Sequence, residues 1–157
     1  MQILKPRALE DRTDELAVYG GAASALGFGG VAYFHAFSRG FLVEAGIGGG
    51  LSGFIVSAMP KVTLGSAHDR FVAGLGPAIS FATGGLIRSA TTAWLNVDAL
   101  GYERRFDNGL AFSITGGATV GLAGKYELCF DYCEDSRPSN LLGFWSPQGR
   151  IGFGYWF

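Results

Sequence analysis

Large apolar residues alternate with small or polar ones along much of the chain. The pattern is clearest in 71–82 and 151–157, where one alternating set is dominated by Phe, Leu, Ile and Tyr and the other by Gly, Ala and Ser. A period of two is typical of β-strands, in which successive side chains point to opposite faces. The pattern therefore predicts strands that have one large apolar face and one small or polar face.

Turn signals divide the chain into eight predicted strands. Their ranges are 16–25, 29–37, 41–50, 54–65, 71–82, 92–106, 109–122 and 148–157. The connections after the second, fourth and sixth strands are short and polar, whereas 83–91 and 123–147 are longer. In an up-and-down arrangement, the three short turns and both termini lie at the same end. The sequence therefore predicts an all-β fold, an eight-stranded antiparallel up-and-down β-barrel.

Two places interrupt the regular pattern. Pro60 and Pro77 have no backbone N–H to donate a hydrogen bond to a neighbouring strand, so we expect bulges or strand ends at these prolines. After Asp98 the alternation changes phase, and an unbroken strand would turn Leu100 toward the polar face. A bulge near Asp98 and Ala99 would return the following apolar residues to the apolar face.

The composition indicates where such a barrel would reside. Gly accounts for 26 of 157 residues, more than twice the share of about 7% in average proteins. Charged residues account for 16%, against about 25% in average proteins. The formal net charge of −1 offers no basic surface, which argues against nucleic acid as a partner. Four stretches without Asp, Glu, Lys or Arg are mostly too short, and too broken by Gly and Pro, for spanning helices. We therefore expect the strands to cross a membrane, as a transmembrane β-barrel.

The last eight residues carry a family resemblance. They resemble the carboxy-terminal signal by which the bacterial outer-membrane assembly machinery recognises its clients, with Arg150, Gly152, Tyr155 and Phe157 at its four positions. Together with the eight strands, this resembles the small eight-stranded bacterial outer-membrane β-barrel proteins, the class that includes the OmpA transmembrane domain. The resemblance implies a bacterial outer membrane, insertion by the barrel assembly machinery, and outer-membrane lipids and lipopolysaccharide as neighbours. We also expect a monomer.

The polar N-terminal segment is left with three interpretations: a periplasmic tail, a short amphipathic helix or a plug. Residues 1–15 contain seven charged side chains and no apolar stretch of signal-peptide length, so we expect that a signal peptide has been removed. We assign 1–15 to a polar segment and 16–157 to the barrel.

The small and polar face should line the lumen. Its charged residues are predicted to be Glu44, Lys61, Asp98, Glu103, Arg105 and Arg150, with Asn96 as the alternative to Asp98. Acids and bases nearly balance, which favours an ion-pair network that fills the lumen, because an unpaired buried charge is costly. Many inward Gly and Ala residues leave two interpretations open: close packing of the strands, or a pocket for an acyl chain or other apolar ligand.

Signals for catalysis are weak. The barrel lipid A deacylases use a His-x-Ser pair, whereas His35 is followed by Ser38, one residue too far. His68 lies in a predicted polar turn, and the histidines lack metal-site spacing, so we expect neither a metal nor a cofactor. Cys129 and Cys133 in the longest connection predict a local disulfide, with metal ligation as the alternative.

The leading hypothesis is therefore an outer-membrane barrel that acts as a non-enzymatic structural or surface-interaction protein with a side-chain-filled lumen. Three alternatives remain: a lipid-binding or lipid A-modifying barrel enzyme, a narrow pore, and a soluble lipocalin-like carrier. The eight-stranded architecture by itself does not decide between them, because one fold hosts many functions.

Overall fold

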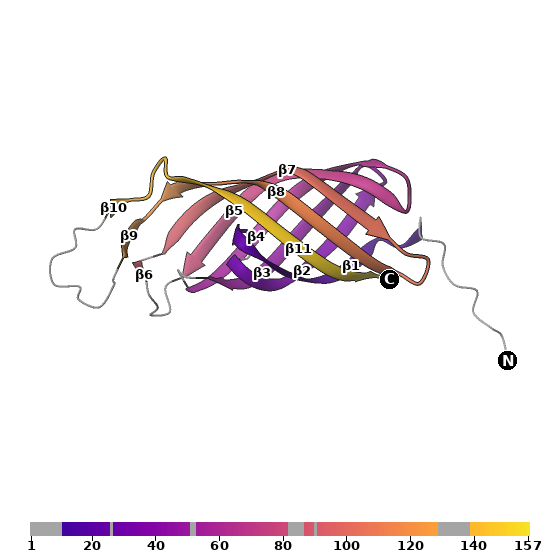
Figure 1. Ribbon diagram of the computed structural model, residues 1–157, viewed down its shortest axis with the longest axis horizontal. Coiled ribbons are helices and arrows are strands. Elements are labelled where there is room, and N and C mark those ends of the chain that lie inside the picture. The colour runs from indigo at the N-terminus through magenta and orange to yellow at the C-terminus, as the bar shows by residue number, and fades with distance from the viewer. Residues whose placement is uncertain (1–10, 26, 51–52, 82–86, 90, 129–138) are drawn as a thin grey trace.

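Eight antiparallel strands close into an up-and-down barrel (Figure 1). The computed structural model describes residues 11–25, 27–50, 53–81, 87–89, 91–128 and 139–157. The barrel strands are β1 (Asp14–Ser24), β2 (Gly27–Ser38), β3 (Phe41–Gly50), β4 (Gly53–Gly65), β5 (Asp69–Phe81), β7 (Thr92–Arg105), β8 (Leu110–Ala123) and β11 (Trp145–Trp156). Each strand pairs with its neighbours in sequence order, and β1 pairs with β11 to close the ring. The predicted fold class is confirmed in its all-β, eight-stranded, up-and-down architecture.

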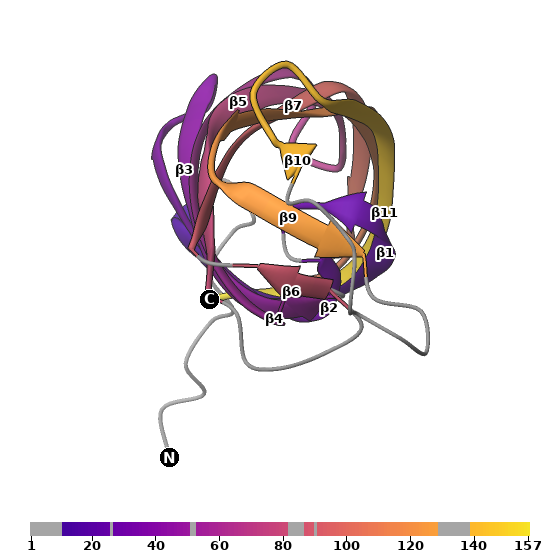
Figure 2. The same cartoon turned by 90° about the vertical axis from the view of Figure 1, so that its left-hand side faces the viewer.

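The two ends of the barrel differ. The three short turns, the start of β1 and the end of β11 share one end, which we call the short-turn end (Figure 1). The opposite end carries a three-stranded sheet of β6 (Ile87–Ser89), β9 (Lys125–Leu128) and β10 (Ser139–Asn140). Figure 2, which looks onto that end, shows the closed ring of strands with the small sheet in front of it. This asymmetry is the one expected from the connection lengths.

One short turn requires glycine for two reasons. Gly109, between β7 and β8, has a φ of 93°, in the left-handed region that side chains disfavour. A Cβ at this position would also lie 2.0 Å from Nη1 of Arg12, which crosses the short-turn end. The turn is closed by the Gly109 N–H, which donates to the carbonyl oxygen of Phe106 at 2.8 Å.

The predicted bulge lies at Ala99. The register shifts at this point in both ladders of β7. In the ladder with β8, Asp98 and Leu100 pair with the consecutive residues Gly117 and Gly116. The ladder with β5 shifts at the same place. Asp98 is consequently buried in the lumen, whereas Leu100 is 69% exposed on the outer face. The bulge restores the apolar outer face, as the change of phase in the sequence indicated.

The expectation of bulges or strand ends at the two prolines is wrong. Pro60 lies within β4 and Pro77 within β5, and the register of this pair is the same on both sides of them, from Ser57 opposite Ala78 to Lys61 opposite Gly74. Both prolines fall in the single stretch between those pairs, where the ladder is interrupted. The two missing N–H groups are thus confined to one shared gap, and the register needs no shift.

The two faces of the sheet differ in chemistry. The outer face is covered by exposed large apolar side chains, among them Val18, Leu75, Ile114, Ile151 and Phe153. The lumen holds the charged and hydroxyl side chains and, toward the short-turn end, an apolar cluster that includes Tyr19, Phe34, Leu42 and Trp156. Among the described residues, no helix is long and apolar enough to cross a membrane.

Candidate functional site: the charged lumen

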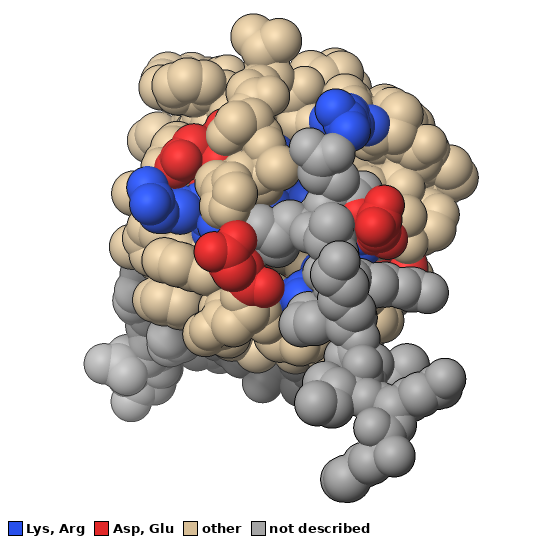
Figure 3. All heavy atoms as spheres, turned by 90° about the vertical axis from the view of Figure 1, so that its right-hand side faces the viewer, with Lys and Arg blue, Asp and Glu red and all other residues tan. Residues whose placement is uncertain are grey.

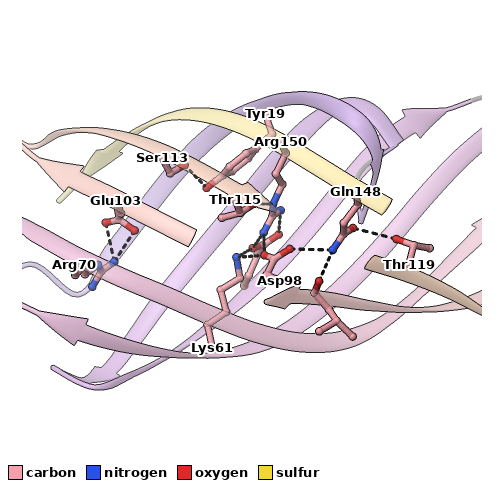
Figure 4. A network of polar contacts seen from close by, with 12 residues as sticks. Tyr19, Lys61, Arg70, Asp98, Glu103, Ser113, Thr115, Thr119, Gln148 and Arg150 are labelled. Atoms are coloured by element: carbon pink, nitrogen blue, oxygen red, sulfur yellow. Dashed lines mark hydrogen bonds and ion pairs between the residues drawn. The ribbon is translucent and has the colours of Figure 1, made fainter. Parts of the chain in front are cut away.

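Four charged side chains from four strands meet in the middle of the lumen. The Arg150 guanidinium of β11 donates to Glu44 of β3 through Nη1–Oε1 and Nη2–Oε2 hydrogen bonds of 2.6 and 2.7 Å, and to Asp98 Oδ2 of β7 at 2.6 Å. Lys61 Nζ of β4 lies 2.6 Å from Glu44 Oε2 and 2.9 Å from Asp98 Oδ2. Each cation therefore contacts both carboxylates. We call this ring of Glu44, Lys61, Asp98 and Arg150 the lumen quartet (Figure 4).

The lumen quartet is almost completely buried and its formal charges balance. Its four residues are between 0% and 3% exposed, with two acids facing two bases. Removing charges from water costs several kcal/mol per ion, which only good geometry and further hydrogen bonds offset. Such support is present, because Arg150 Nε donates to Thr115 Oγ1 at 3.1 Å and Gln148 Nε2 donates to Asp98 Oδ1 at 3.1 Å.

Aromatic rings add a second kind of support to the two cations. The Arg150 guanidinium carbon lies 4.7 Å from the centroid of the Tyr19 ring, and Lys61 Nζ lies 5.4 Å from the Phe34 centroid. A cation within about 6 Å of an aromatic face is attracted by the ring quadrupole. The quartet therefore connects the apolar cluster on β1 and β2 with the polar wall on β7, β8 and β11.

A second charged cluster lies toward the short-turn end. Arg70 Nη2 donates to both oxygens of Glu103, at 2.8 and 2.9 Å, and Arg105 Nε donates to Glu103 Oε1 at 2.8 Å. The Arg105 guanidinium lies over the Trp156 ring, 3.4 Å from its centroid. Figure 4 shows the Arg70–Glu103 pair displaced along the barrel from the lumen quartet.

Arg70 and Glu15 belong to the lumen but were missing from the predicted charged set. The sequence assigned Arg70 to a polar turn, whereas β5 begins at Asp69, so the inward set that continues with Val72 starts at Arg70. Continuing the alternation of this strand from Val72 two residues toward the N-terminus would have placed Arg70 on the lumen face. Similarly, β1 begins at Asp14, two residues before the predicted start of the barrel, and Glu15 is 2% exposed. The ladder with β2 extends to these residues although they are polar.

Hydroxyl and amide side chains continue the lumen toward the opposite end. Thr119 Oγ1 bridges Asn96 Oδ1 at 2.6 Å and Gln148 Oε1 at 3.0 Å. Asn96 and Asp98 are both inward, so the predicted alternatives occupy the same face of β7. Beyond them, Ser80 and Thr92 form a buried hydroxyl pair.

The short-turn end is closed by polar contacts from the chain preceding β1. Arg12 is 8% exposed and donates to the carbonyl oxygens of Trp156 at 3.0 Å and Asp107 at 3.3 Å. Figure 3 shows acidic and basic side chains on this end of the molecule. At this end of the barrel Arg104 and Asp69 form an exposed ion pair of 3.0 Å, and His68 contacts Asp107 at 2.9 Å.

The four residues of the predicted assembly signal divide between the lumen and the outside, three of them on β11 and Phe157 directly after it. Arg150 belongs to the lumen quartet, whereas Tyr155 and Phe157 are exposed on the outside. Gly152 faces the Tyr19 ring so closely that a Cβ would lie 2.2 Å from Tyr19 Cε1. Recognition by an assembly machinery stays a prediction, but the structure supplies a packing reason for Gly152.

The sequence analysis weighed the histidines and the two cysteines as candidates for catalysis or metal binding. His35 contacts Asp14 at 2.8 Å near the start of β1, and Tyr33 donates to the same carboxylate. Among the described residues, no group of three or more His, Cys, Asp or Glu side chains is arranged to hold a metal ion. Cys129 and Cys133 lie outside the described residues, so their pairing stays a prediction.

The inward small residues serve mainly close strand packing around β5. A Cβ at Gly76 would lie 2.1 Å from the Ala58 carbonyl oxygen, and one at Gly74 would lie 2.5 Å from Lys61 Cγ. A shallow depression of about 410 Å³ does occur at the end opposite the short turns. It is lined by Phe28, Gly48, Gly49, Gly50, Gly53 and Phe54.

Comparison of the chain with protein-family models, curated proteins and solved structures finds no match. The class of protein is therefore defined by the fold and the lumen alone. The chain forms an eight-stranded up-and-down barrel with a charged, internally paired lumen and an apolar outer face.

Proposed function

We propose that the protein is a bacterial outer-membrane β-barrel that acts as a non-enzymatic structural or surface-interaction protein, of the class that includes the OmpA transmembrane domain. The observation that carries the proposal is that charged side chains are buried and large apolar side chains are exposed, the reverse of their distribution in a soluble protein. Charged residues such as Glu44 and Arg150 are buried in the lumen. Every strand of the barrel, in contrast, carries large apolar residues on the outside that are 39–78% exposed, among them Val18, Phe71 and Leu75. A soluble barrel exposing this surface to water would associate or aggregate.

The outer surface has the features of a membrane-facing belt. Outer-membrane barrels carry an apolar band flanked by aromatic residues at both interfaces. On this barrel Tyr33, Tyr102 and Tyr155 lie toward the short-turn end and Trp145 lies toward the opposite end. Trp94 is not part of this belt, because it shares the lumen face of β7 with Thr92 and donates to the Thr92 hydroxyl. The Tyr33 and Tyr102 hydroxyls donate to Asp14 and to Asp69, which places polar groups next to these rings. Lipids and lipopolysaccharide are the partners such a belt would contact.

The proposed class also indicates which end of the barrel faces which side of the membrane. Short turns of outer-membrane barrels face the periplasm and the longer connections face outward. The short-turn end would then be periplasmic, and the barrel assembly machinery would recognise Arg150, Gly152 and Tyr155 of β11 together with Phe157. We propose that the protein resides in the outer membrane and functions as a monomer.

The filled lumen favours an anchor over a pore. The lumen quartet joins β3, β4, β7 and β11 across the barrel, and the Arg70–Glu103–Arg105 cluster lies toward the short-turn end. A narrow pore would show conductance steps when the protein is reconstituted in a planar bilayer. The proposal predicts that such recordings show no steps, and regular steps would favour the pore instead.

Refolding with and without amphiphile tests the proposed location. The purified chain is diluted from denaturant into buffer alone, detergent micelles or phospholipid vesicles, and folding is followed by circular dichroism. The proposal predicts β-structure with detergent or vesicles, co-flotation with the vesicles, and aggregation in buffer alone. A folded, soluble monomer in buffer without amphiphile would contradict it and support a soluble carrier.

A further inference from the structure

Buried polar atoms without a hydrogen-bond partner gather at one place in the lumen. Among the described residues, six buried side-chain atoms lack a partner, and four of them belong to Glu15, Arg70, Arg105 and Trp156. These atoms are Glu15 Oε2, Arg70 Nε, Arg105 Nη2 and Trp156 Nε1. Buried polar groups in folded proteins are nearly always hydrogen-bonded, so a concentration of exceptions indicates a binding site for a small polar molecule.

The four side chains are neighbours, and Glu15 lies opposite Trp156 in the ladder of β1 with β11. Arg70 and Arg105 share the Glu103 Oε1 atom, each at 2.8 Å, and their guanidinium carbons lie 5.0 and 3.4 Å from the centroid of the Trp156 ring. Glu15, Arg70, Arg105 and Trp156 are 2%, 6%, 7% and 0% exposed, so more than nine-tenths of each is buried. We call these four residues the lower chamber, because they lie on the short-turn side of the lumen quartet.

The backbone makes room for Glu15 at this place. A Cβ on Gly154 of β11 would lie 1.9 Å from Glu15 Oε1, so the carboxylate occupies the space that a side chain on β11 would fill. Both arginines and Glu103 act on Glu15 electrostatically, yet within the described residues no direct ion pair joins Glu15 to either arginine. A bridging molecule can connect groups that lie beyond direct hydrogen-bond reach.

The chemistry of the unpartnered atoms selects the bridging molecule. Arg70, Arg105 and Trp156 each offer an N–H donor, whereas Glu15 Oε2 needs a donor. A metal cation would be repelled by the two guanidinium groups. A halide can accept from the three N–H groups but leaves an ionised Glu15 Oε2 without a donor. Water both accepts and donates, and buried waters typically make about three hydrogen bonds.

We propose that the lower chamber binds internal water, which accepts from Arg70, Arg105 and Trp156 and donates to the Glu15 carboxylate. The water links β1 to β5, β7 and β11 below the lumen quartet, so that the short-turn end is held by a hydrated contact rather than a direct ion pair. A buried polar group without a hydrogen-bond partner keeps the full cost of its removal from bulk water, which gives the bridging water a clear energetic role. The inference does not depend on the proposed membrane location.

The three tryptophans allow a direct test by nuclear magnetic resonance of the full chain in detergent micelles. Cross-relaxation from water to the indole N–H of each tryptophan is measured. Trp94 Nε1 donates to Thr92 Oγ1 at 2.9 Å and serves as the bonded reference, whereas Trp145 is 67% exposed near the end of the barrel opposite the short turns and serves as the interfacial reference. The proposal predicts a cross-peak of long-lived water at Trp156, and no such cross-peak at Trp94. A Trp156 indole without contact to water would overturn it.

A halide titration and a pair of glycine variants complete the test. A saturable shift of the Trp156 indole with chloride at constant ionic strength would assign the chamber to an anion and overturn the water proposal. Gly154→Ala should displace Glu15 and remove the water cross-peak. Gly149→Ala, whose Cβ would lie 3.8 Å from the nearest atom, should leave it unchanged. If Gly154→Ala does not fold, the wild-type cross-peak and the chloride titration still decide the outcome.

Discussion

Arg150 and Glu44 are 106 residues apart in the chain and face each other across the barrel through two hydrogen bonds of 2.6 and 2.7 Å. Neither side chain has access to water, and each also contacts the second acid or base of the lumen quartet. Because β11 and β3 are not neighbours in the barrel, this contact fixes their relation independently of the backbone ladders.

Arg150→Met should destabilise the protein strongly. The substitution leaves Glu44 and Asp98 facing Lys61 alone, and removing one partner of a buried ion pair typically costs about 3–5 kcal/mol. The free energy of unfolding, measured by urea titration in detergent micelles, checks this. The matched control is Arg104→Met, because the Arg104–Asp69 pair is exposed and such pairs contribute about 0–1 kcal/mol. Equal effects of the two variants would mean that the quartet does not bear on stability.

Gly152→Ala should destabilise the barrel through Tyr19. The added Cβ would lie 2.2 Å from Tyr19 Cε1, and overpacking of this kind costs about 1–3 kcal/mol. Gly149→Ala on the same strand has room for its Cβ and should cost less. In urea unfolding, combining Gly152→Ala with Tyr19→Ala should give a smaller loss than the sum of the two single variants. Strict additivity would show that Gly152 is not needed for packing against Tyr19 and would leave recognition as its role.

Deletion of Ala99 should prevent formation of the native barrel. Without the bulge, either the residues before it or those after it change face, so that Asp98 turns outward or Leu100 turns inward. The yield of folded protein after dilution into detergent, measured by circular dichroism and protease resistance, checks this. Ala99→Val keeps the residue count and adds its side chain to the exposed face, so it should fold with normal yield. Normal folding of the deletion variant would refute the role assigned to the bulge.

The sequence predicted the architecture because lumen and exterior impose opposite demands on alternate residues. The eight strands, the connection asymmetry and the bulge near Ala99 all follow from the period of two and its interruption. The prolines were interpreted as two separate irregularities, because one chain does not reveal that Pro60 and Pro77 share a gap between β4 and β5.

The site was harder to predict than the fold. Alternation could assign residues such as Glu44, Lys61 and Arg150 to the lumen face, but the distribution of charges between two clusters depends on the stagger of the strands around the barrel. Arg70 and Glu15 were missed because they lie at strand ends, where polar residues resemble turns. The dependence of Glu15 on Gly154 is a contact between β1 and β11 that no local pattern contains.

The central claim is that lipid, not water, covers the outer face, and two arginine substitutions test it most directly. Ile151 lies near the middle of β11 on the outer face, and Leu64 lies near the short-turn end of β4, 78% exposed. Unfolding free energies are measured for Ile151→Arg and Leu64→Arg in phospholipid vesicles. A membrane barrel predicts a loss of about 2–4 kcal/mol for Ile151→Arg and about 0–1 kcal/mol for Leu64→Arg. Losses within about 0.5 kcal/mol of zero for both variants, as expected for surface positions in water, would contradict the account.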